Sequence, residues 1–271
     1  MKKFLPIIAI VVVFIIGLSV LLYPVISAIL SKMSEASTIV SYQNAVEDLT
    51  ETDIAKMKAD AQKYNETLYG AILTDPFASE QDLDTSYVEL LNVNEVMGYI
   101  EIPKINVYLP IFHGSTPEVL EKGVGHLEST SLPIGGESTH AVLTGHRGLP
   151  SATLFTDLDQ LKEGDEFYVH ILDEVLAYKV DQIKVVEPED TKDITIVKGK
   201  DYVTLVTCTP YGINTQRLLI RGERTEYVAE EHQTQASFSM VNEVIIVPAV
   251  FIALASIPIV LLVRKKRKAK K

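Results

Sequence analysis

Cys208 is the residue whose position most strongly suggests covalent chemistry. It is the only cysteine among 271 residues, which excludes internal disulfides and thiolate-rich metal or iron–sulfur sites. It ends a strongly β-prone run, 203–207, and precedes a turn-rich loop, 209–214. Catalytic groups concentrate on loops held by a rigid scaffold, so a thiol at this junction is a candidate nucleophile. A small buried core residue is the competing interpretation.

A catalytic cysteine needs a proton partner and a group that stabilises an oxyanion. His146 is the favoured partner because it directly follows a predicted strand, and the glycines on either side allow close backbone approach. Arg217 and Arg221 are the candidate stabilisers; they share one face of the next strand, and proximity to the Cys208 loop favours Arg217. Five other histidines remain candidates. We expect His113 and His126 in loops and His140 and His170 in strands; the fifth is His232.

The segments that must position these groups are short β-strands. Several of them alternate polar and apolar residues, as half-buried strands do. Seven strand candidates with few helices predict a closed or nearly closed β-barrel. Two short helices interrupt the strands, one with Thr116 as N-cap and one near 151–161. The seven candidates are 98–102, 107–111, 140–144, 166–172, 175–186, 202–208 and 217–221.

The region before the barrel has a different texture. Residues 41 to about 69 carry apolar side chains at helical spacing and predict an amphipathic helix or a pair of helices. Pro76 ends this pattern, because proline disfavours helix at the residue before it. Residues 78–87 form a predicted surface loop, and Phe77 is the conspicuous apolar residue beside it.

Charge and hydrophobicity are both segregated along the chain. The net charge is −11, but nine of the 25 basic residues lie at the two ends. The remaining 16 face 36 acidic residues, so the interior carries about −20. This excludes a nucleic-acid-binding body, which needs a basic face. The 47% hydrophobic content excludes a disordered acidic chain.

Two uncharged runs predict membrane segments. Residues 4–30 contain no charged side chain, and residues 244–263 are long enough to span a bilayer before the basic tail 264–271. By the positive-inside rule both termini are cytoplasmic if the first segment is retained, and the acidic body is extracytoplasmic. A cleaved signal peptide is the alternative for the first run, and a buried core helix for the second.

The arrangement around Cys208 resembles the sortases, membrane-anchored cysteine transpeptidases of Gram-positive bacteria. The resemblance rests on Thr-Leu-Val-Thr-Cys at 204–208, Arg217 nine residues later and His146 in a Thr-Gly-His-Arg context. It covers about 98–224. The C-terminal span with its basic tail, and Asp75-Pro76-Phe77 ahead of the barrel, are similar to the class C, pilus-assembling branch.

The resemblance implies a mainly β fold, a closed eight-stranded sortase-type barrel with short helices, flanked by transmembrane helices. The expected organisation begins with an N-terminal signal or anchor segment (1–31) and a helical region (38–90) that includes a lid loop (74–78). The catalytic barrel (91–228), a C-terminal transmembrane helix (244–263) and a cytoplasmic tail (264–271) follow.

The same resemblance implies the roles of the site residues. Cys208 would be the nucleophile, His146 the general acid/base and Arg217 the oxyanion stabiliser, without metal or organic cofactor. Asp75 would pair with Arg217, and Phe77 would lie against the thiol, as a gate; a plain turn with one docked aromatic is the simpler interpretation.

The expected reaction is cleavage of an LPxTG-like sorting signal between Thr and Gly, then transfer to a lysine amine of a pilin subunit. One alternative is anchoring of surface proteins or pili to cell-wall peptide, which differs only in the incoming amine. The other is a non-enzymatic bitopic receptor or scaffold. The expected partners are pilins and the membrane, with cell-wall peptide precursor in the anchoring case and no nucleic acid.

Overall fold

The computed structural model describes residues 5–68, 70, 73–77 and 83–228. The predicted C-terminal span 244–263, the basic tail 264–271 and His232 lie outside these residues. The chain divides into two units, 1–227 and 228–271, and only the first is discussed below.

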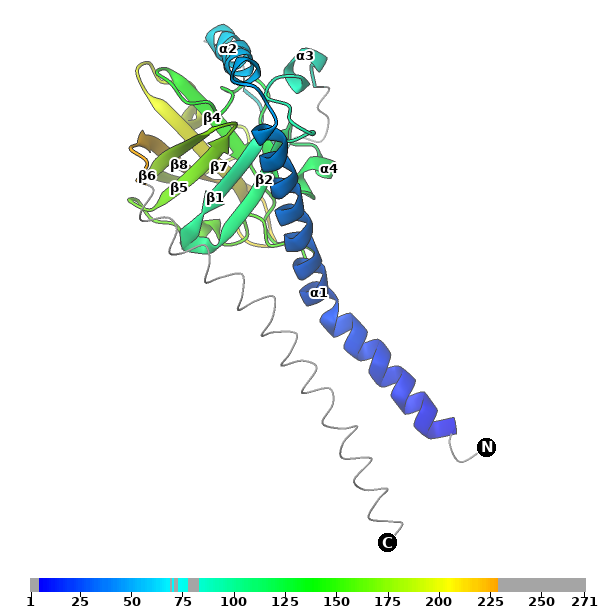
Figure 1. The fold of residues 1–271 in the computed structure, drawn as a ribbon. Coiled ribbons are helices and arrows are strands. Elements are labelled where there is room, and N and C mark those ends of the chain that lie inside the picture. The colour runs from blue at the N-terminus through cyan, green and yellow to red at the C-terminus, as the bar shows by residue number, and fades with distance from the viewer. Residues whose placement is uncertain (1–4, 69, 71–72, 78–82, 229–271) are drawn as a thin grey trace. The chain divides into compact units, whose positions relative to one another are not determined.

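Eight strands form a closed barrel in the order β1-β2-β3-β4-β7-β8-β6-β5, which confirms the predicted fold (Figure 1). Most neighbouring strands are antiparallel, but β2–β3 and β4–β7 are parallel. The strands are β1 (Gly98–Ile102), β2 (Val107–His113), β3 (Val124–His126), β4 (Thr139–Thr144), β5 (Glu166–Ile171), β6 (Glu174–Val186), β7 (Asp201–Thr209) and β8 (Gln216–Thr225).

Three local predictions need correction. His126 lies in β3 and His113 ends β2, so neither is in a loop. A strand of three residues is too short for alternation to reveal it.

The helix predicted near 151–161 is only a 3-10 turn, η2 (Leu158–Gln160). Leu154 has a φ of +41°, a conformation that interrupts a right-handed helix, and it is buried in the core as part of an irregular loop. The other predicted helix is present as α4 (Pro117–Leu120).

Two apolar clusters lie on opposite faces of the barrel wall. The main core contains Leu205 of β7 and Ile220 of β8. A second cluster contains the neighbouring residues Val206 and Leu219. Successive side chains of a strand point to opposite faces, so the second cluster lies on the outer side. We call it the outer cluster; it consists of Leu127, Val142, Ile194, Val206 and Leu219.

The N-terminal helix α1 (Leu5–Glu47) is one unbroken element that crosses the expected boundary between 1–31 and 38–90. Its last turns pack on the barrel, where the buried Tyr42 hydroxyl donates to the Met97 carbonyl (3.2 Å) and accepts from the Leu172 amide (2.7 Å). Its earlier apolar side chains are exposed; Val20 is 70% exposed. Among the described residues, α1 is the one helix long and apolar enough to cross a membrane.

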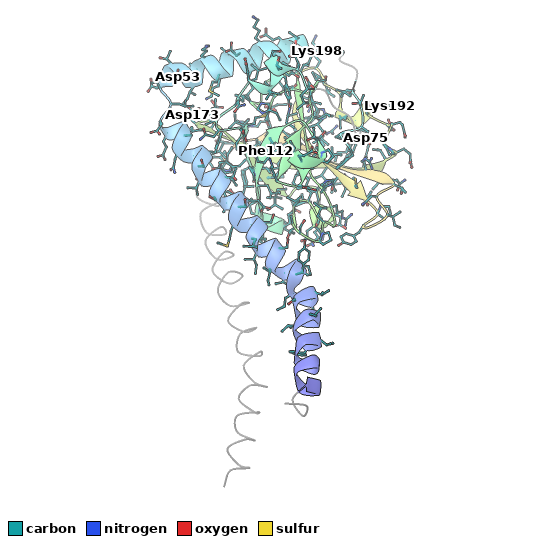
Figure 2. The ribbon with its side chains drawn as sticks, turned by 90° about the vertical axis from the view of Figure 1, so that its right-hand side faces the viewer. Asp53, Asp75, Phe112, Asp173, Lys192 and Lys198 are labelled. Carbon is teal, nitrogen blue, oxygen red and sulfur yellow. The ribbon has the colours of Figure 1, made fainter. Side chains whose placement is uncertain are left out.

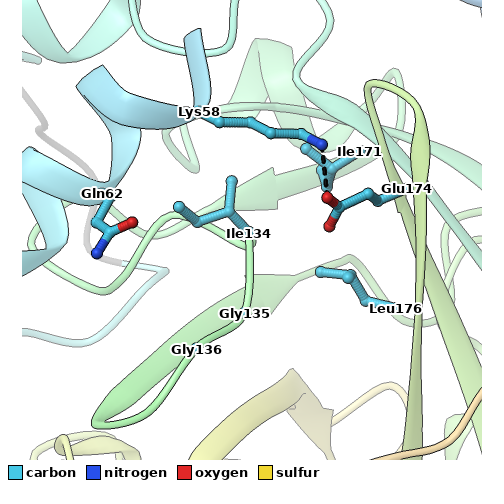
Figure 3. A pocket seen from close by; sticks show the side chains of 8 residues that line it. All are labelled: Lys58, Gln62, Ile134, Gly135, Gly136, Ile171, Glu174 and Leu176. Carbon is cyan, nitrogen blue, oxygen red and sulfur yellow. Dashed lines mark hydrogen bonds and ion pairs between the residues drawn. The ribbon is translucent and has the colours of Figure 1, made fainter. Parts of the chain in front are cut away.

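The second helix of the predicted pair, α2 (Glu51–Thr67), begins at a capping box in which Thr50 and Asp53 satisfy each other's backbone amides. The Asn65 side chain attaches it to the barrel, accepting from the Leu132 amide (2.7 Å) and donating to the Leu132 carbonyl (3.1 Å). Lys58 also reaches across a cavity of about 270 Å³ to Glu174 of β6 (Figure 3). A third helix, α3 (Thr85–Val88), begins within the segment 78–87 that was predicted as a loop, so that prediction is wrong for residues 85–87.

Candidate active site

Cys208 and Arg217 occupy directly opposed positions on the antiparallel strands β7 and β8. Cys208 follows Val206 by two residues, and Arg217 precedes Leu219 by two, so both continue the face that carries the outer cluster. The cysteine is 8% exposed, and the Arg217 side chain is 11% exposed. The structure therefore brings the predicted thiol and guanidinium together at one end of this face.

His146 reaches the same place through β4. β4 and β7 are parallel, and Thr144 is the last β4 residue in the ladder, opposite Val206. The Gly145 amide then donates to the Val206 carbonyl (3.1 Å), and the Thr207 hydroxyl donates to the Gly145 carbonyl (2.7 Å). These bonds carry the chain past the end of β4 alongside β7, so His146 emerges beside the end that bears Cys208.

Gly145 is required at this junction for packing. A Cβ atom on this residue would lie 2.8 Å from the ring of Phe155, which is fully buried. Any larger residue would displace either Phe155 or the backbone that carries His146. The glycine preceding His146 thus permits close approach, as predicted, and the partner is a core aromatic ring.

The lid segment lies across these groups. Arg217 donates from Nε to Asp75 Oδ1 (2.8 Å) and from Nη2 to Asp75 Oδ2 (2.6 Å), a bidentate ion pair. The Phe77 ring lies 5.9 Å from the His146 ring and 5.0 Å from the Arg217 guanidinium carbon. The predicted Asp75–Arg217 contact is present in the structure. In Figure 2, Asp75 and Asp173 are labelled on opposite sides of the view.

A further contact holds the lid at its proline. The buried Ser115 hydroxyl donates to the Pro76 carbonyl at 2.5 Å. Phe77 and Leu73 also pack against the outer cluster. Ser115 was not among the predicted site residues. No pattern in the sequence indicates a bond between residues 39 positions apart.

Electrostatics at the site favour the neutral forms of the reacting pair. Burial raises the pKa of the Cys208 thiol; Arg217 opposes this shift, and Asp75 adds to it. Burial lowers the pKa of His146, and Glu121 opposes that shift. With the lid in place, the thiol and the neutral imidazole therefore predominate near neutral pH.

Arg221, the alternative arginine, lies elsewhere on β8. It is opposite Thr204 and donates to both carboxylate oxygens of Asp181 at 2.9 and 2.7 Å. Its guanidinium also stacks over the Tyr202 ring at 4.2 Å. These contacts hold Arg221 on the side of the barrel, so its position is accounted for without a role beside Cys208.

The remaining described histidines are held by structural contacts. His126 is fully buried, with Nε2 donating to the Ser131 carbonyl and Nδ1 bonded to the Tyr87 hydroxyl, both at 2.8 Å. His113 bonds to the Leu90 carbonyl at 2.6 Å. His170 stacks on Tyr99. Among the described histidines, His146 is therefore the one that lies beside Cys208 and Arg217.

The described residues contain no group of three or more His, Cys, Asp or Glu side chains arranged to hold a metal ion. The groups that meet at the site are the thiol of Cys208, the imidazole of His146, the guanidinium of Arg217 and the lid segment.

Comparison with known proteins identifies the family of this chain and several of its relatives. The Sortase domain family matches residues 100–225. Sortase C-1 from Streptococcus pneumoniae is 50% identical with a TM-score of 0.68, and the match covers 71% of this chain and all of that one. The pilus-related sortase C of Group B Streptococcus is 49% identical with a TM-score of 0.66, over 69% and 96% of the two chains.

Sortase D of Bacillus subtilis (strain 168) is 35% identical over 133 residues, 48% of this chain and 64% of that protein. The match therefore spans just under two thirds of that relative. The chain belongs to the sortase family of cysteine transpeptidases. Its structural neighbours are pilus-related class C sortases, and α1 agrees with the membrane anchoring of sortases.

Proposed function

We propose that the protein is a class C, pilin-polymerising sortase. Its donor is a pilin with an LPxTG-like sorting signal, cleaved between Thr and Gly, and its acceptor is a lysine amine of another pilin. The observation that carries this proposal is the opposed pair Cys208 and Arg217, with His146 beside them and the Asp75–Arg217 ion pair above. The likeness to pilus-related sortases supports the choice of donor and acceptor.

The reaction has two acyl-transfer steps. His146 takes the proton of the Cys208 thiol, and the thiolate attacks the Thr carbonyl carbon. The oxyanion that forms is stabilised by Arg217, which remains charged throughout. His146 gives a proton to the departing Gly amine, leaving a Thr thioester on Cys208. The lysine amine then attacks the thioester, His146 accepts its proton, and the thiolate departs. The product is an isopeptide bond, and return of this proton from His146 to the Cys208 thiolate restores the starting form of the enzyme.

The outer cluster is suited to the apolar part of the donor. It continues the face of Cys208 along β7 and β8 and is partly covered by Phe77 and Leu73 of the lid segment. The Leu and Pro of the signal would occupy this surface when the lid moves away. Asp75 and Phe77 therefore act as a gate: they engage the arginine and cover the surface that the donor needs.

The proposed topology places the barrel outside the cell. The acidic body between the two apolar segments is extracytoplasmic, and both termini are cytoplasmic if the first segment is retained. The length and composition of α1 support the first anchor.

The test uses the full chain in detergent with purified pilins that carry the sorting signal. We expect a ladder of covalent multimers, and mass spectrometry of a Cys208 thioacyl adduct whose mass identifies cleavage after Thr. Cys208→Ala is the matched control and should give neither product. Transfer only to cell-wall peptide, without multimers, would establish the anchoring alternative. Unaltered multimer formation by Cys208→Ala would support a scaffold and exclude catalysis by this residue.

A further inference from the structure

A second cavity, of about 260 Å³, lies beside the outer cluster. It is distinct from the cavity under Lys58 shown in Figure 3. One side is formed by the segment that leads into the lid, with Leu68, Gly70 and Leu73. The barrel and the β6–β7 connection form the rest, with Ser129, Thr130, His140, Ile194, Thr195 and Ile196.

The cavity is continuous with the proposed donor surface. Ile194 lines the cavity and also belongs to the outer cluster, and Leu73 packs against that cluster. Thr130 accepts a hydrogen bond from the amide of Val142, another member of the cluster (3.2 Å). A chain leaving the outer cluster in the direction away from Cys208 therefore enters this cavity.

His140 fixes the barrel side of the cavity. Its Nδ1 donates to the Thr195 carbonyl at 2.8 Å, and its Nε2 accepts from the Thr204 hydroxyl at 2.7 Å. The imidazole thus joins the β6–β7 connection to β4 and β7 through both ring nitrogens. Ile194 and Ile196 are held in place on either side of Thr195, so this part of the cavity is built before any ligand arrives.

Strand geometry gives the distance from the nucleophile. Val142 pairs with Thr204, four residues before Cys208, and His140 pairs with Tyr202, six residues before it. At about 3.3 Å per residue the cavity begins about 13 Å from Cys208 and extends to about 20 Å. An extended donor with its Thr carbonyl at Cys208 covers this interval with the fourth to sixth residues before that Thr. Those residues lie one to three positions before the Leu of the motif.

We propose that this cavity is a subsite for the donor chain upstream of its sorting motif, and that it selects an uncharged, apolar side chain there. The inference rests on the proposed function and extends it. The barrel side of the cavity keeps Ile194 and Ile196 when the lid segment with Leu73 moves away. Its other lining residues are Ser, Thr and His140, whose two ring nitrogens are both hydrogen-bonded. A charged side chain would lose hydration in this cavity without gaining a partner of opposite charge.

The test compares three donor peptides with one LPxTG motif on the full chain in detergent. The first contains the motif alone, the second has Leu two positions before the motif, and the third has Asp there. The readout is kcat/KM for thioacyl formation on Cys208. We expect the Leu peptide to exceed the motif-only peptide about tenfold, mainly through KM, which corresponds to about 1.4 kcal/mol. The Asp peptide should show no gain.

Two neighbouring variants locate the effect. Ile196→Asp places a charge in the cavity and should abolish the advantage of the Leu peptide while leaving the motif-only rate unchanged. Val197→Asp is the matched control, because Val197 is 42% exposed and does not line the cavity; the advantage should persist. Equal rates for the Leu and motif-only peptides, or an equal loss for both in Ile196→Asp, would overturn the subsite. Absence of any adduct with all three peptides would overturn the proposed function, and the subsite with it.

Discussion

Arg217 is bound by Asp75 through two hydrogen bonds although the residues are 142 positions apart. The same arginine stands directly opposite Cys208. Its charge is therefore shared between a carboxylate that is already present and an oxyanion that would form only during reaction. Because Asp75 also raises the pKa of Cys208, the lid disfavours the thiolate electrostatically as well as covering the site.

Replacing Asp75 with Asn should activate the thiol. The change removes the negative charge that raises the pKa of Cys208, while Arg217 continues to lower it. The alkylation midpoint should move to lower pH, and the rate with iodoacetamide at pH 7 should rise about tenfold, because a hydrogen bond to a charged group contributes about 1.5–3 kcal/mol. The pH dependence of Cys208 alkylation measures both effects.

Asp173→Asn provides the control for that variant, since Asp173 pairs with Lys58 at a separate place on the barrel. It should alkylate at the wild-type rate. An Asp75→Asn protein with the wild-type midpoint and rate would show that the carboxylate neither restrains the lid nor acts on the thiol.

Ser115→Ala should loosen the lid without changing its charge. The variant removes the donor to the Pro76 carbonyl and leaves the Asp75–Arg217 pair intact. A neutral hydrogen bond contributes about 0.5–1.5 kcal/mol, so we expect alkylation about two- to tenfold faster with no shift of the pH midpoint. Alkylation kinetics across pH separate this result from that of Asp75→Asn. A shifted midpoint at the wild-type maximal rate would contradict a purely mechanical role.

Arg217→Gln and Arg221→Gln form a matched pair for the oxyanion role. Loss of one oxyanion donor lowers kcat about 10²–10³-fold in other acyl-transfer enzymes. We expect such a loss in Arg217→Gln and a near-normal kcat in Arg221→Gln, because Arg221 contacts Asp181 and Tyr202. Single-turnover thioacyl formation is the measurement. Equal losses in both variants would indicate damage to β8.

Two buried histidines should make the fold acid-sensitive. Burial lowers the pKa of His126 to about 3 and that of His140 to about 4. The unfolded chain binds these protons near pH 6.5, so the stabilisation is fully present above that pH. It is lost as pH falls toward the folded values, by up to about 1.4 kcal/mol per pH unit for each histidine.

Histidine NMR titration and thermal unfolding between pH 7 and pH 4 test this expectation. The Cε1–Hε1 signals of His126 and His140 should stay those of neutral imidazole at pH 5.5. Titration of either residue near pH 6.5 would show that its ring is hydrated in the folded protein.

The number of short strand candidates, with few helices between them, was enough to predict a closed or nearly closed barrel, because seven of its strands are long enough to be recognised. The exception, β3, is three residues long, and the histidine within it was expected in a loop. The extent of α1 was also hidden. Its apolar and amphipathic parts have different hydrophobic patterns, yet the backbone is helical across both, and Pro24 lies within it.

The site was predictable where its residues adjoin strand ends and less so where contacts are remote. Cys208, His146 and Arg217 could be selected from strand boundaries. Side-chain orientation did not separate Arg217 from Arg221, and proximity to the Cys208 loop favoured Arg217. Register separates them, by placing Arg217 opposite Cys208. The Ser115–Pro76 bond and the cavity beside His140 depend on tertiary packing between distant segments, and no local pattern encodes them.

The opposition of Cys208 and Arg217 has a consequence for how such a site changes over time. The ladder that pairs them ends at Thr209 and Gln216, so the connection 210–215 contributes no rung to it. Its Tyr211 and Ile213 are 60% and 67% exposed, respectively. Added length in this connection would leave the paired residues of β7 and β8 in register. The reactive pair is therefore constrained by backbone pairing, which changes in the connection would leave intact. Such changes would instead act on the surroundings of the pair, because Tyr211 lies against Arg147 and Gly148 and the Asn214 carbonyl accepts from Arg217.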